Sequence, residues 1–229
     1  MSTIFHEIGN SLRQQGVLKT LRALLAYVPD LLFDRWYGID TLRWEQLHGL
    51  TIVGPNRQHG VHYQPIRSNA LKPLLSELRL PQDKVFMDIG CGKGKALILA
   101  AGQGFRRLAG VEFSRELCRI AERNLEIFAK RSDLVLDCRI INIDAAEYVI
   151  ADDVGVIFMF NPFDDAVMAG FVTRLESAVM KNRDGLWVIY GYPLHDHILE
   201  ASSCFTKLGK YEFAEIAFSV YKSIPAGSR

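Results

Sequence analysis

One stretch of ten residues constrains the fold of this chain more than any other feature. Residues 85–89 are apolar except for Asp88, which is typical of a buried strand, and they run into a turn at 90–94 in which three glycines alternate with other residues. A helical pattern begins at Lys95. Glycine allows positive φ and a close approach to a ligand, and the helix points free N–H groups and its positive dipole end at that ligand. The stretch predicts a loop around a small molecule, rather than a turn that merely needs glycine.

The spacing of the glycines distinguishes two kinds of ligand. A nicotinamide or flavin dinucleotide loop has the pattern G-x-G-x-x-G, in which the third glycine lets the helix pack closely on the strand. Counted from Gly90 and Gly92, that glycine would fall at position 95, where the chain has Lys95, and Gly94 comes one place early. Asp88 would repel a pyrophosphate, whereas a methionine-type ammonium group is a good partner for an acid. The loop therefore favours such a ligand, with the dinucleotide as the alternative.

Apolar segments and amphipathic helices alternate from residue 68 onward, which indicates a parallel sheet covered on both faces. The predicted strands are residues 84–88, 107–112, 135–143, 154–160 and 185–190, followed by an antiparallel edge near 204–208 and 211–222. A helix after the second strand has an apolar stripe at Leu117, Ala121, Leu125 and Phe128, and residues 164–181 repeat the pattern. These features predict a doubly wound α/β fold with helices on both faces of the sheet.

The first sixty residues have a different character. Apolar residues at helical spacing predict one helix before Gly16 and another after it, and Pro29 is expected to end the second. A loop would follow, carrying Phe33, Trp36, Tyr37 and Trp44. We expect residues 1–60 to form a helical extension that packs on the main domain, residues 61–229, or on a second copy in a homodimer, and that caps the substrate. The alternative is peripheral contact with a membrane surface.

Composition and spacing exclude several classes of protein. The net charge is +1 and no lysine or arginine run occurs, so no nucleic-acid partner is expected. The four cysteines are far apart without metal-ligand spacing, so no metal is expected, and Cys91 needs only to be small. No stretch approaches the ~18 apolar residues of a membrane span, and no signal-peptide layout is visible, which predicts a cytoplasmic location.

Acidic residues follow the next two predicted strands. In an open α/β sheet, ligands bind beyond the carboxyl ends of the strands, where the strand order reverses. Glu112 ends the second strand, and its carboxylate would accept two hydrogen bonds from a ribose diol, because Ser114 already serves as the helix cap. Asp144 follows the third strand and would accept the amine of an adenine, with Ala145 leaving room for the ring. Asp-Ala is also common at helix starts, which is the alternative reading.

These motifs together resemble the class I, Rossmann-like methyltransferases that depend on S-adenosylmethionine. The resemblance covers about residues 63–192 and includes the glycine loop, the acids after strands two and three, and a polar loop after strand four, in the family's order. It implies S-adenosylmethionine as the cofactor and a mostly parallel seven-stranded sheet. The implied cofactor-binding residues are Tyr63, Asp88, Gly90, Cys91, Gly92, Gly94, Glu112, Phe113, Asp144, Ala145 and Asn161. Residues 33–41 and 61–65 are similar to a bacterial subgroup of unknown substrate, and the chain looks more loosely like non-SET protein-lysine methyltransferases.

The loop after the fourth strand is predicted to carry the catalytic residues Asn161, Pro162 and Phe163. Displacement at a methyl–sulfonium releases a neutral thioether, so the enzyme must mainly align the nucleophile. The Asn161 oxygen and a main-chain carbonyl would accept hydrogens from an attacking amine, and Phe163 would pack on a planar substrate or screen the sulfonium. Asn-Pro is also an ordinary turn starter. Amino-directed methyltransferases carry a second proline in this motif, and this chain has only Pro162.

The expected acceptor is therefore a nitrogen, in a protein side chain or a small-molecule amine. One alternative is an oxygen or carbon acceptor in a small metabolite, with a histidine or tyrosine near the pocket as base. Another is a partner subunit that binds S-adenosylmethionine without catalysis.

Overall fold

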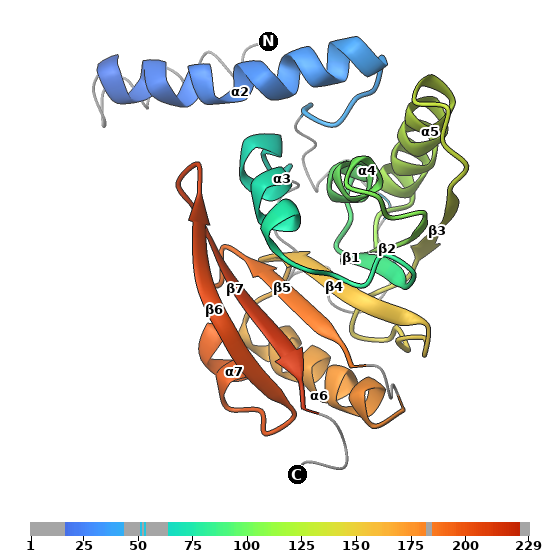
Figure 1. Cartoon of the computed structure of the whole chain (residues 1–229), viewed down its shortest axis with the longest axis vertical. Coiled ribbons are helices and arrows are strands. Elements are labelled where there is room, and N and C mark those ends of the chain that lie inside the picture. The colour runs from blue at the N-terminus through green and yellow to red at the C-terminus, as the bar shows by residue number, and fades with distance from the viewer. Residues whose placement is uncertain (1–16, 44–50, 52, 54–63, 182–184, 225–229) are drawn as a thin grey trace.

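The computed structural model describes residues 17–43, 51, 53, 64–181 and 185–224, and it contains a single twisted sheet of seven strands (Figure 1). The strand order is β3-β2-β1-β4-β5-β7-β6. All neighbours from β3 to β5 pair in parallel, and β7 pairs antiparallel with both β5 and β6. The strands are β1 (Val85–Ile89), β2 (Arg107–Glu112), β3 (Asp137–Asn142), β4 (Val154–Phe160), β5 (Trp187–Gly191), β6 (Phe205–Phe213) and β7 (Ile216–Ser223). The predicted doubly wound, mostly parallel fold is confirmed.

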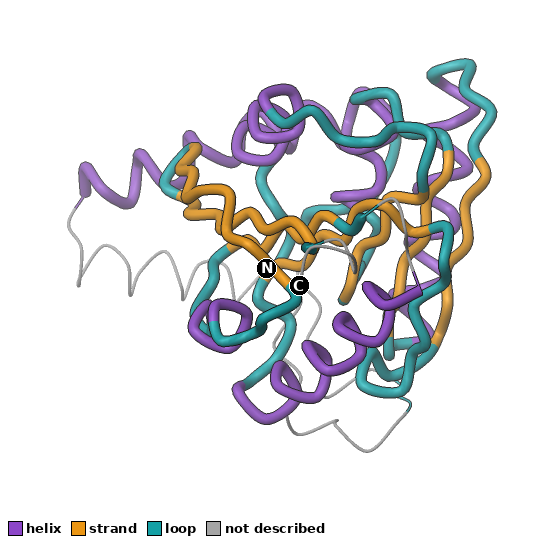
Figure 2. Tube along the Cα trace, turned by 60° about the horizontal axis from the view of Figure 1, so that its bottom comes forward, coloured by secondary structure: helices purple, strands orange, loops and turns teal. Residues whose placement is uncertain are grey.

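The helices form one layer on each face of the sheet (Figure 2). They are α3 (Ser68–Glu77), α4 (Lys95–Gly102), α5 (Arg115–Arg131), α6 (Asp165–Lys181) and α7 (Asp196–Glu200). Alternate residues of each strand point to opposite faces. Accordingly, Phe86 of β1 belongs to the core under α3, α4 and α5, whereas its neighbour Met87 belongs to the core over α6 and α7. The predicted apolar stripes of α5 and α6 are buried.

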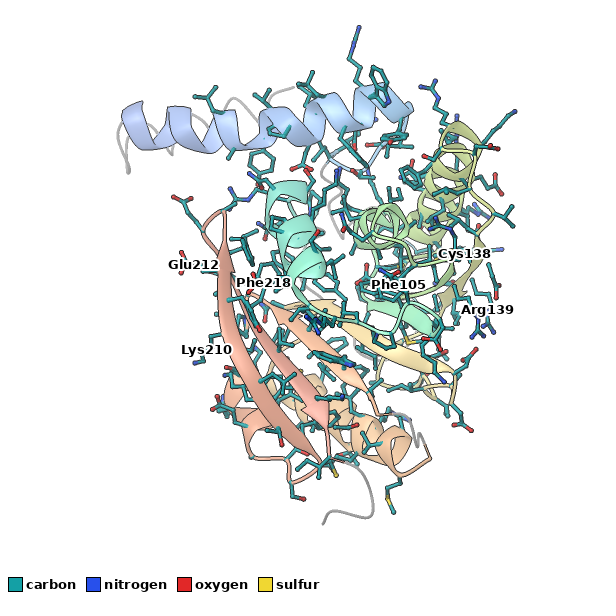
Figure 3. All side chains as sticks on the ribbon, viewed as in Figure 1. Phe105, Cys138, Arg139, Lys210, Glu212 and Phe218 are labelled. Atoms are coloured by element: carbon teal, nitrogen blue, oxygen red, sulfur yellow. The ribbon has the colours of Figure 1, made fainter. Side chains whose placement is uncertain are left out.

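The C-terminal hairpin differs from its prediction. β6 was expected to end near residue 208, but it continues to Phe213, and the turn is made by Ala214 and Glu215 with φ of 51° and 63°. Gly209 instead lies at a shift in register between β6 and β7, as expected for a bulge. Outward side chains of β6 such as Lys210 and Glu212 are exposed, whereas Phe218 of β7 is fully buried (Figure 3).

The N-terminal segment corrects a second prediction. The helix α2 spans Val17–Tyr37 and continues through Pro29, which was expected to end it. A proline inside a helix removes one backbone hydrogen bond, but tertiary contacts of the next two turns hold them in place. Phe33 and Tyr37 therefore lie on this helix and not in a loop, and their rings pack with Phe128 of α5.

The remaining predictions for this segment lie mostly outside the described residues. These include the first predicted helix, the side chains of α2 before residue 25, and Trp44. Leu25 is 58% exposed and Trp36 is 76% exposed, so one face of α2 does not contact the main domain. The predicted division of the chain at residue 60 stays a prediction. None of the described helices is long and apolar enough to cross a membrane.

Candidate active site

The glycine loop lies at the carboxyl end of β1, where the strand order reverses between β1 and β4. Gly90, Gly92 and Gly94 have φ values of 76°, 51° and 80°, a region that favours glycine. The N–H groups of Gly90 and Cys91 donate to the carbonyl oxygen of Val111 in β2, at 2.8 and 3.0 Å. Gly94 is the residue before the first turn of α4, whose N-terminus faces the loop. The predicted strand, turn and helix are confirmed.

Two buried carboxyl groups stand beside the loop. Burial, and then the charge of Glu112, raises the pKa of Asp88 well above its ordinary value. Burial raises the pKa of Glu112 to about 7, although hydrogen bonds from backbone N–H groups oppose the shift. The low polarity around both groups therefore favours their protonated forms until a positive or hydrogen-donating group approaches. Such a pair of acids suits a ligand that carries an ammonium group and hydroxyl groups.

The expectation that Glu112 is left free by the cap at Ser114 is wrong. Ser114 does cap α5, because its hydroxyl accepts from the N–H of Leu117 at 3.3 Å. Nevertheless, Glu112 accepts hydrogen bonds of 2.9 Å from the N–H groups of Gly92 and Ser114, one on each carboxylate oxygen. Each oxygen of a carboxylate has a second lone pair, so Glu112 retains acceptor capacity for a ligand.

The predicted adenine residues lie at the end of β3, beside the end of β2. Asp144 and Ala145 are buried, and the N–H of Ile143 donates to the carbonyl oxygen of Glu112 at 3.2 Å. One oxygen of Asp144 accepts from the N–H of Ala146 at 2.9 Å, so this acid also stabilises the turn. Phe113 is half-buried, and its carbonyl oxygen accepts from the N–H of Val53 at 3.0 Å.

A small pocket opens at the glycine loop. It is lined by Asp88 of β1, by Gly90 and Cys91 from the loop, by Phe158 and Phe160 from β4, and by Gln64, Pro65, Ile66, Lys95 and Ala96. Tyr63 lies outside the described residues, but its neighbour Gln64 reaches the pocket. Burial raises the pKa of the Cys91 thiol well above its ordinary value, which fits its expected lack of a nucleophilic role.

The Asn161–Phe163 loop is in contact with the glycine loop. A Cβ atom placed on Gly90 would lie 3.0 Å from the Cβ atom of Pro162. Asn161 has a positive φ of 42°, which asparagine tolerates better than most residues. The ring of Phe163 packs against Phe171 of α6, with the ring centroids 5.4 Å apart. Phe163 therefore contributes in part to the hydrophobic core.

A buried tyrosine holds the side chain of Asn161. The hydroxyl of Tyr190, at the end of β5, donates to Oδ1 of Asn161 at 3.1 Å and accepts from the N–H of His195 at 3.3 Å. Because the N–H of His195 is only a donor, the hydroxyl proton of Tyr190 is available for Asn161. Oδ1 of Asn161, and not its amide nitrogen, therefore points toward Tyr190. Sequence analysis did not predict this bond.

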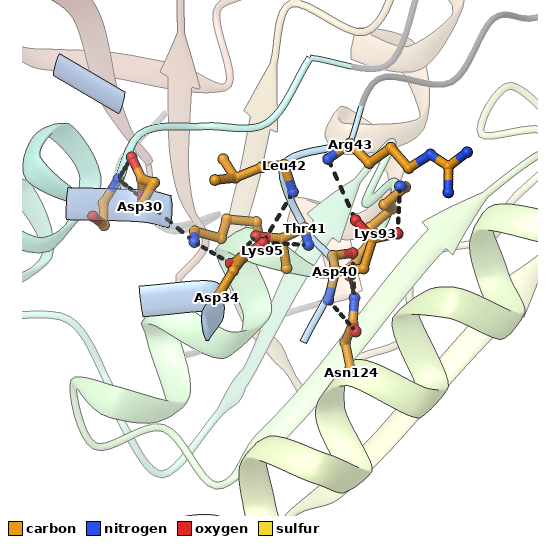
Figure 4. Close-up of polar contacts among 10 residues, drawn as sticks. Asp30, Asp34, Asp40, Thr41, Leu42, Arg43, Lys93, Lys95 and Asn124 are labelled. Carbon is orange, nitrogen blue, oxygen red and sulfur yellow. Dashed lines mark hydrogen bonds and ion pairs between the residues drawn. The ribbon is translucent and has the colours of Figure 1, made fainter. Parts of the chain in front are cut away.

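Sequence analysis also missed a polar network behind the loop. Lys93 and Lys95 are buried, and they pair with Asp40, and with Asp30 and Asp34, of the N-terminal segment (Figure 4). A signal was present in the sequence, because lysines at the N-terminus of a helix meet the positive end of its dipole. Two lysines flanking Gly94 therefore needed nearby acids. Within the described residues, no group of histidine, cysteine or acidic side chains could hold a metal ion.

Comparisons with solved structures find this architecture in methyltransferases. A putative methyltransferase from Escherichia coli is 15% identical, covering 67% of this chain and 83% of the other, with a TM-score of 0.52. A putative RNA methyltransferase from Pyrococcus horikoshii is 17% identical, covering 78% and 95%, with a TM-score of 0.52. An RNA methyltransferase from Salinibacter ruber in complex with S-adenosyl-L-homocysteine is 16% identical, covering 69% and 95%, with a TM-score of 0.50. The comparison with curated proteins finds no match.

The strand order, and the glycine loop at its switch point, define the class of fold. The chain has the Rossmann-like α/β fold that these methyltransferases share. More particularly, residues 61–161 match the family model described as "Histone methylation protein DOT1", which is less than half of the 229 residues. The expectation that excluded nucleic acid is not supported, because structures with this fold include RNA methyltransferases.

The residues of the site fit S-adenosylmethionine. The space beside Gly90 exists only because this residue has no Cβ, and Pro162 faces it. Asp88 and Glu112 supply two buried acids for an ammonium group and for hydroxyl groups, next to the N-terminus of α4. The apolar rings of Phe158 and Phe160 also line the pocket.

Proposed function

We propose that this protein transfers the methyl group of S-adenosylmethionine to a nitrogen, in a protein side chain or a small-molecule amine. One observation carries the proposal: the Asn161–Phe163 loop touches the glycine loop, since a Cβ atom on Gly90 would lie 3.0 Å from that of Pro162. The group that would aim an acceptor is therefore next to the loop that would hold the methyl donor. When bound, the cofactor supplies an electrophilic methyl group on a sulfonium.

Each acid of the site has a role in holding the cofactor. Asp88 would accept a hydrogen bond from the ammonium group of the methionine part. Glu112 would accept hydrogen bonds from the ribose hydroxyls through its remaining lone pairs. Asp144 would accept the exocyclic amine of adenine, while Ala145 leaves room for the ring. The glycine loop would bring its backbone close to the methionine part, which is why positive φ is required there. Binding would favour the ionised forms of Asp88 and Glu112.

The residues of the chain would act on the acceptor by alignment and desolvation. The departing thioether is neutral, so no acid is needed, and the barrier falls when the nucleophile lies on the methyl–sulfur axis. Oδ1 of Asn161, through its remaining lone pair, and a main-chain carbonyl of the loop would accept N–H groups of the amine. The amine must be neutral to attack, and apolar neighbours such as Phe160 and Tyr192, whose ring centroids are 6.5 Å apart, lower the pKa of an amine placed beside them.

The description of the matched family supports a protein side chain among the nitrogen acceptors, because it names histone methylation. Neighbours of the fold include RNA methyltransferases and a mitomycin 7-O-methyltransferase, and these are the competing acceptor classes. The competing acceptors lead to different products, so labelled methyl groups distinguish them.

Purified protein should be incubated with radiolabelled S-adenosylmethionine and with protein, RNA and small-molecule fractions of a bacterial extract. The label should appear on nitrogen in the protein or amine fraction. Label on RNA, on oxygen or on carbon would overturn the acceptor proposed here. Binding of S-adenosylhomocysteine without any transfer would indicate a non-catalytic subunit.

Two variants test the role of Asn161 in the same assay. Asn161→Gly keeps the positive φ but removes the amide, so turnover should fall by about a hundredfold while binding of S-adenosylhomocysteine survives. Asn161→Asp keeps an oxygen acceptor and is expected to retain more activity than Asn161→Gly. Wild-type turnover in Asn161→Gly would show that the side chain does not aim the acceptor.

A further inference from the structure

Two charged lysine side chains, one in the glycine loop and one at the start of α4, are buried. Lys93 is 0% exposed and Lys95 is 2% exposed, and they flank Gly94 at the start of α4. Burying an ammonium group is costly unless it is paired, and the dipole of α4 opposes a cation at this position. The chain therefore has to supply negative charge at this point for the loop to close.

That charge comes from the N-terminal segment, more than fifty residues earlier in the sequence. Nζ of Lys93 lies 3.0 Å from Asp40, and Nζ of Lys95 lies 3.1 Å from Oδ1 of Asp34 and 3.3 Å from Oδ1 of Asp30. Lys95 also lies over the ring of Phe33, 4.3 Å from its centroid. Side chains on α2 and just after it thus hold both lysines.

The aspartates are themselves fixed. Asp34 accepts from the N–H and the hydroxyl of Thr41, both at 2.6 Å, and Asp30 accepts from the N–H of Ser68 at 3.0 Å, at the start of α3. The carboxylates of Asp34 and Asp30 are buried on α2, and each is bonded to another part of the chain: to the turn at Thr41 and to the start of α3. A lysine paired with such an acid is held in one position.

Asn124 of α5 completes the network (Figure 4). Its Oδ1 accepts from the N–H of Asp40 at 3.0 Å, and its Nδ2 donates to the carbonyl oxygens of Asp40 at 2.9 Å and of Lys93 at 3.0 Å. The segment after α2 is therefore bound to the backbone of the loop as well as to its side chains.

The network fixes the end of the glycine loop at which the lysines flank Gly94, and Lys95 also lines the pocket with Asp88. Val111 and Glu112 hold the other end, at Gly90, Cys91 and Gly92, through hydrogen bonds. A turn with three glycines loses much conformational freedom when it is ordered, so its shape depends on such anchors.

We propose that Asp34, assisted by Asp30 and Asp40, is a positioning residue for S-adenosylmethionine: through Lys95 and Lys93 it holds the glycine loop in the shape that binds the cofactor. This inference rests on the cofactor of the proposed function and not on the nature of the acceptor. Asp34 acts through the lysines, so its removal changes affinity for the cofactor without removing any group that would touch it.

The test compares the binding of S-adenosylhomocysteine by calorimetry in the full-length wild type and in the Asp34→Asn, Lys95→Met and Arg131→Gln variants. Arg131 is the control, because it binds the same segment to α5 through the carbonyl oxygen of Trp36 and does not touch the loop. Asp34→Asn and Lys95→Met should each weaken binding by about tenfold or more, and Arg131→Gln by no more than about twofold. Melting temperatures without ligand are measured for all proteins, and titrations are made well below them.

The outcomes separate positioning from simple stabilisation. If Asp34→Asn and Lys95→Met melt earlier but bind S-adenosylhomocysteine as tightly as the wild type, the proposal is overturned. If either fails to fold, Asp40→Asn serves instead, because that carboxylate is half-exposed, and it should weaken binding by about threefold. Unchanged binding in that variant would also overturn the proposal. Failure of the wild type to bind would overturn the cofactor assignment itself.

Discussion

The hydroxyl of Tyr190 lies 3.1 Å from Oδ1 of Asn161, which joins the end of β5 to the loop after β4. Tyr190 is 1% exposed, and the N–H of His195 donates to the same hydroxyl. The amide that is proposed to aim the acceptor thus has one orientation set by a buried phenol. An amide that is already oriented does not have to reorganise when the acceptor binds. Such preorganisation is a main source of the rate enhancement by polar groups in active sites.

Replacement of Tyr190 tests this orientation. In Tyr190→Phe the amide of Asn161 is free to rotate, so turnover should fall by about tenfold, whereas binding of S-adenosylhomocysteine should not change. Methyl-transfer rates and calorimetric titrations measure the two quantities. Tyr211→Phe, a change on β6 away from this loop, is the matched control. A wild-type rate in Tyr190→Phe would mean that the phenol does not orient the amide.

The ligand-free protein should lose stability as the pH rises through about 7. Glu112 has a pKa of about 7 in the folded protein against an ordinary value of 4.5, so folding favours its protonated form. Its contribution, on the order of 3 kcal/mol, is complete below about pH 4.5 and is lost as the pH rises through about 7. Asp88 shifts in the same direction.

Urea titrations of the wild type and of Glu112→Gln at pH 5.5, 7 and 8.5 measure this dependence. The wild type should be the more pH-sensitive of the two proteins. S-adenosylhomocysteine should stabilise the wild type more at pH 8.5 than at pH 5.5, because the carboxylate forms would bind it. Identical pH profiles for the two proteins would contradict the assignment of the shift to Glu112.

Substitution of Gly90 should disrupt the site. Gly90→Ala places a Cβ atom at φ of 76° and 3.0 Å from Pro162, which should cost about 1–3 kcal/mol of stability and weaken S-adenosylhomocysteine binding by about tenfold or more. Gly170→Ala is the control, since Gly170 lies in α6 with no heavy atom within 4 Å of an added Cβ, and it should stabilise the protein by about 0.5–1 kcal/mol. Equal effects of the two substitutions on binding would refute this account of the loop.

Pro29→Ala should stabilise the protein by about 1–2 kcal/mol. Pro29 is exposed inside α2, where a proline lacks the N–H of a helical hydrogen bond. The gain from restoring that bond exceeds the loss of the restraint that proline places on the unfolded chain. Urea unfolding at fixed pH measures the difference. A decrease in stability would show that the proline ring contributes to the docking of α2.

The glycine loop and the acids beside it were predictable because the signals are local. A buried strand, a turn that needs positive φ and a helix start follow one another within residues 85–102, and Glu112 is found by its position after the next strand. The hydrogen bonds of Glu112 to Gly92 and Ser114 were not predictable, since they depend on how two strands align.

The sequence signalled that Lys95 needed an acidic partner, but it did not identify Asp34, which is 61 positions away. Only the docking of α2 brings them together, and the same docking carries the helix through Pro29, where local preference alone would end it. The turn after β6 was misplaced for a related reason. Gly209 is a strong local turn signal, but it pairs with Val220 just after a register shift, and the turn is made by Ala214 and Glu215.

Both ends of the sheet carry exposed charges. At one end β3 presents Asp137 and Arg139, and at the other β6 presents Lys210 and Glu212 and is bent by the register shift at Gly209 (Figure 3). An edge strand has unpaired backbone groups that invite another molecule to add its own strand, and charged side chains and bulges discourage this. These charges and the bulge therefore disfavour edge-to-edge aggregation, in which a strand of another molecule would extend the sheet.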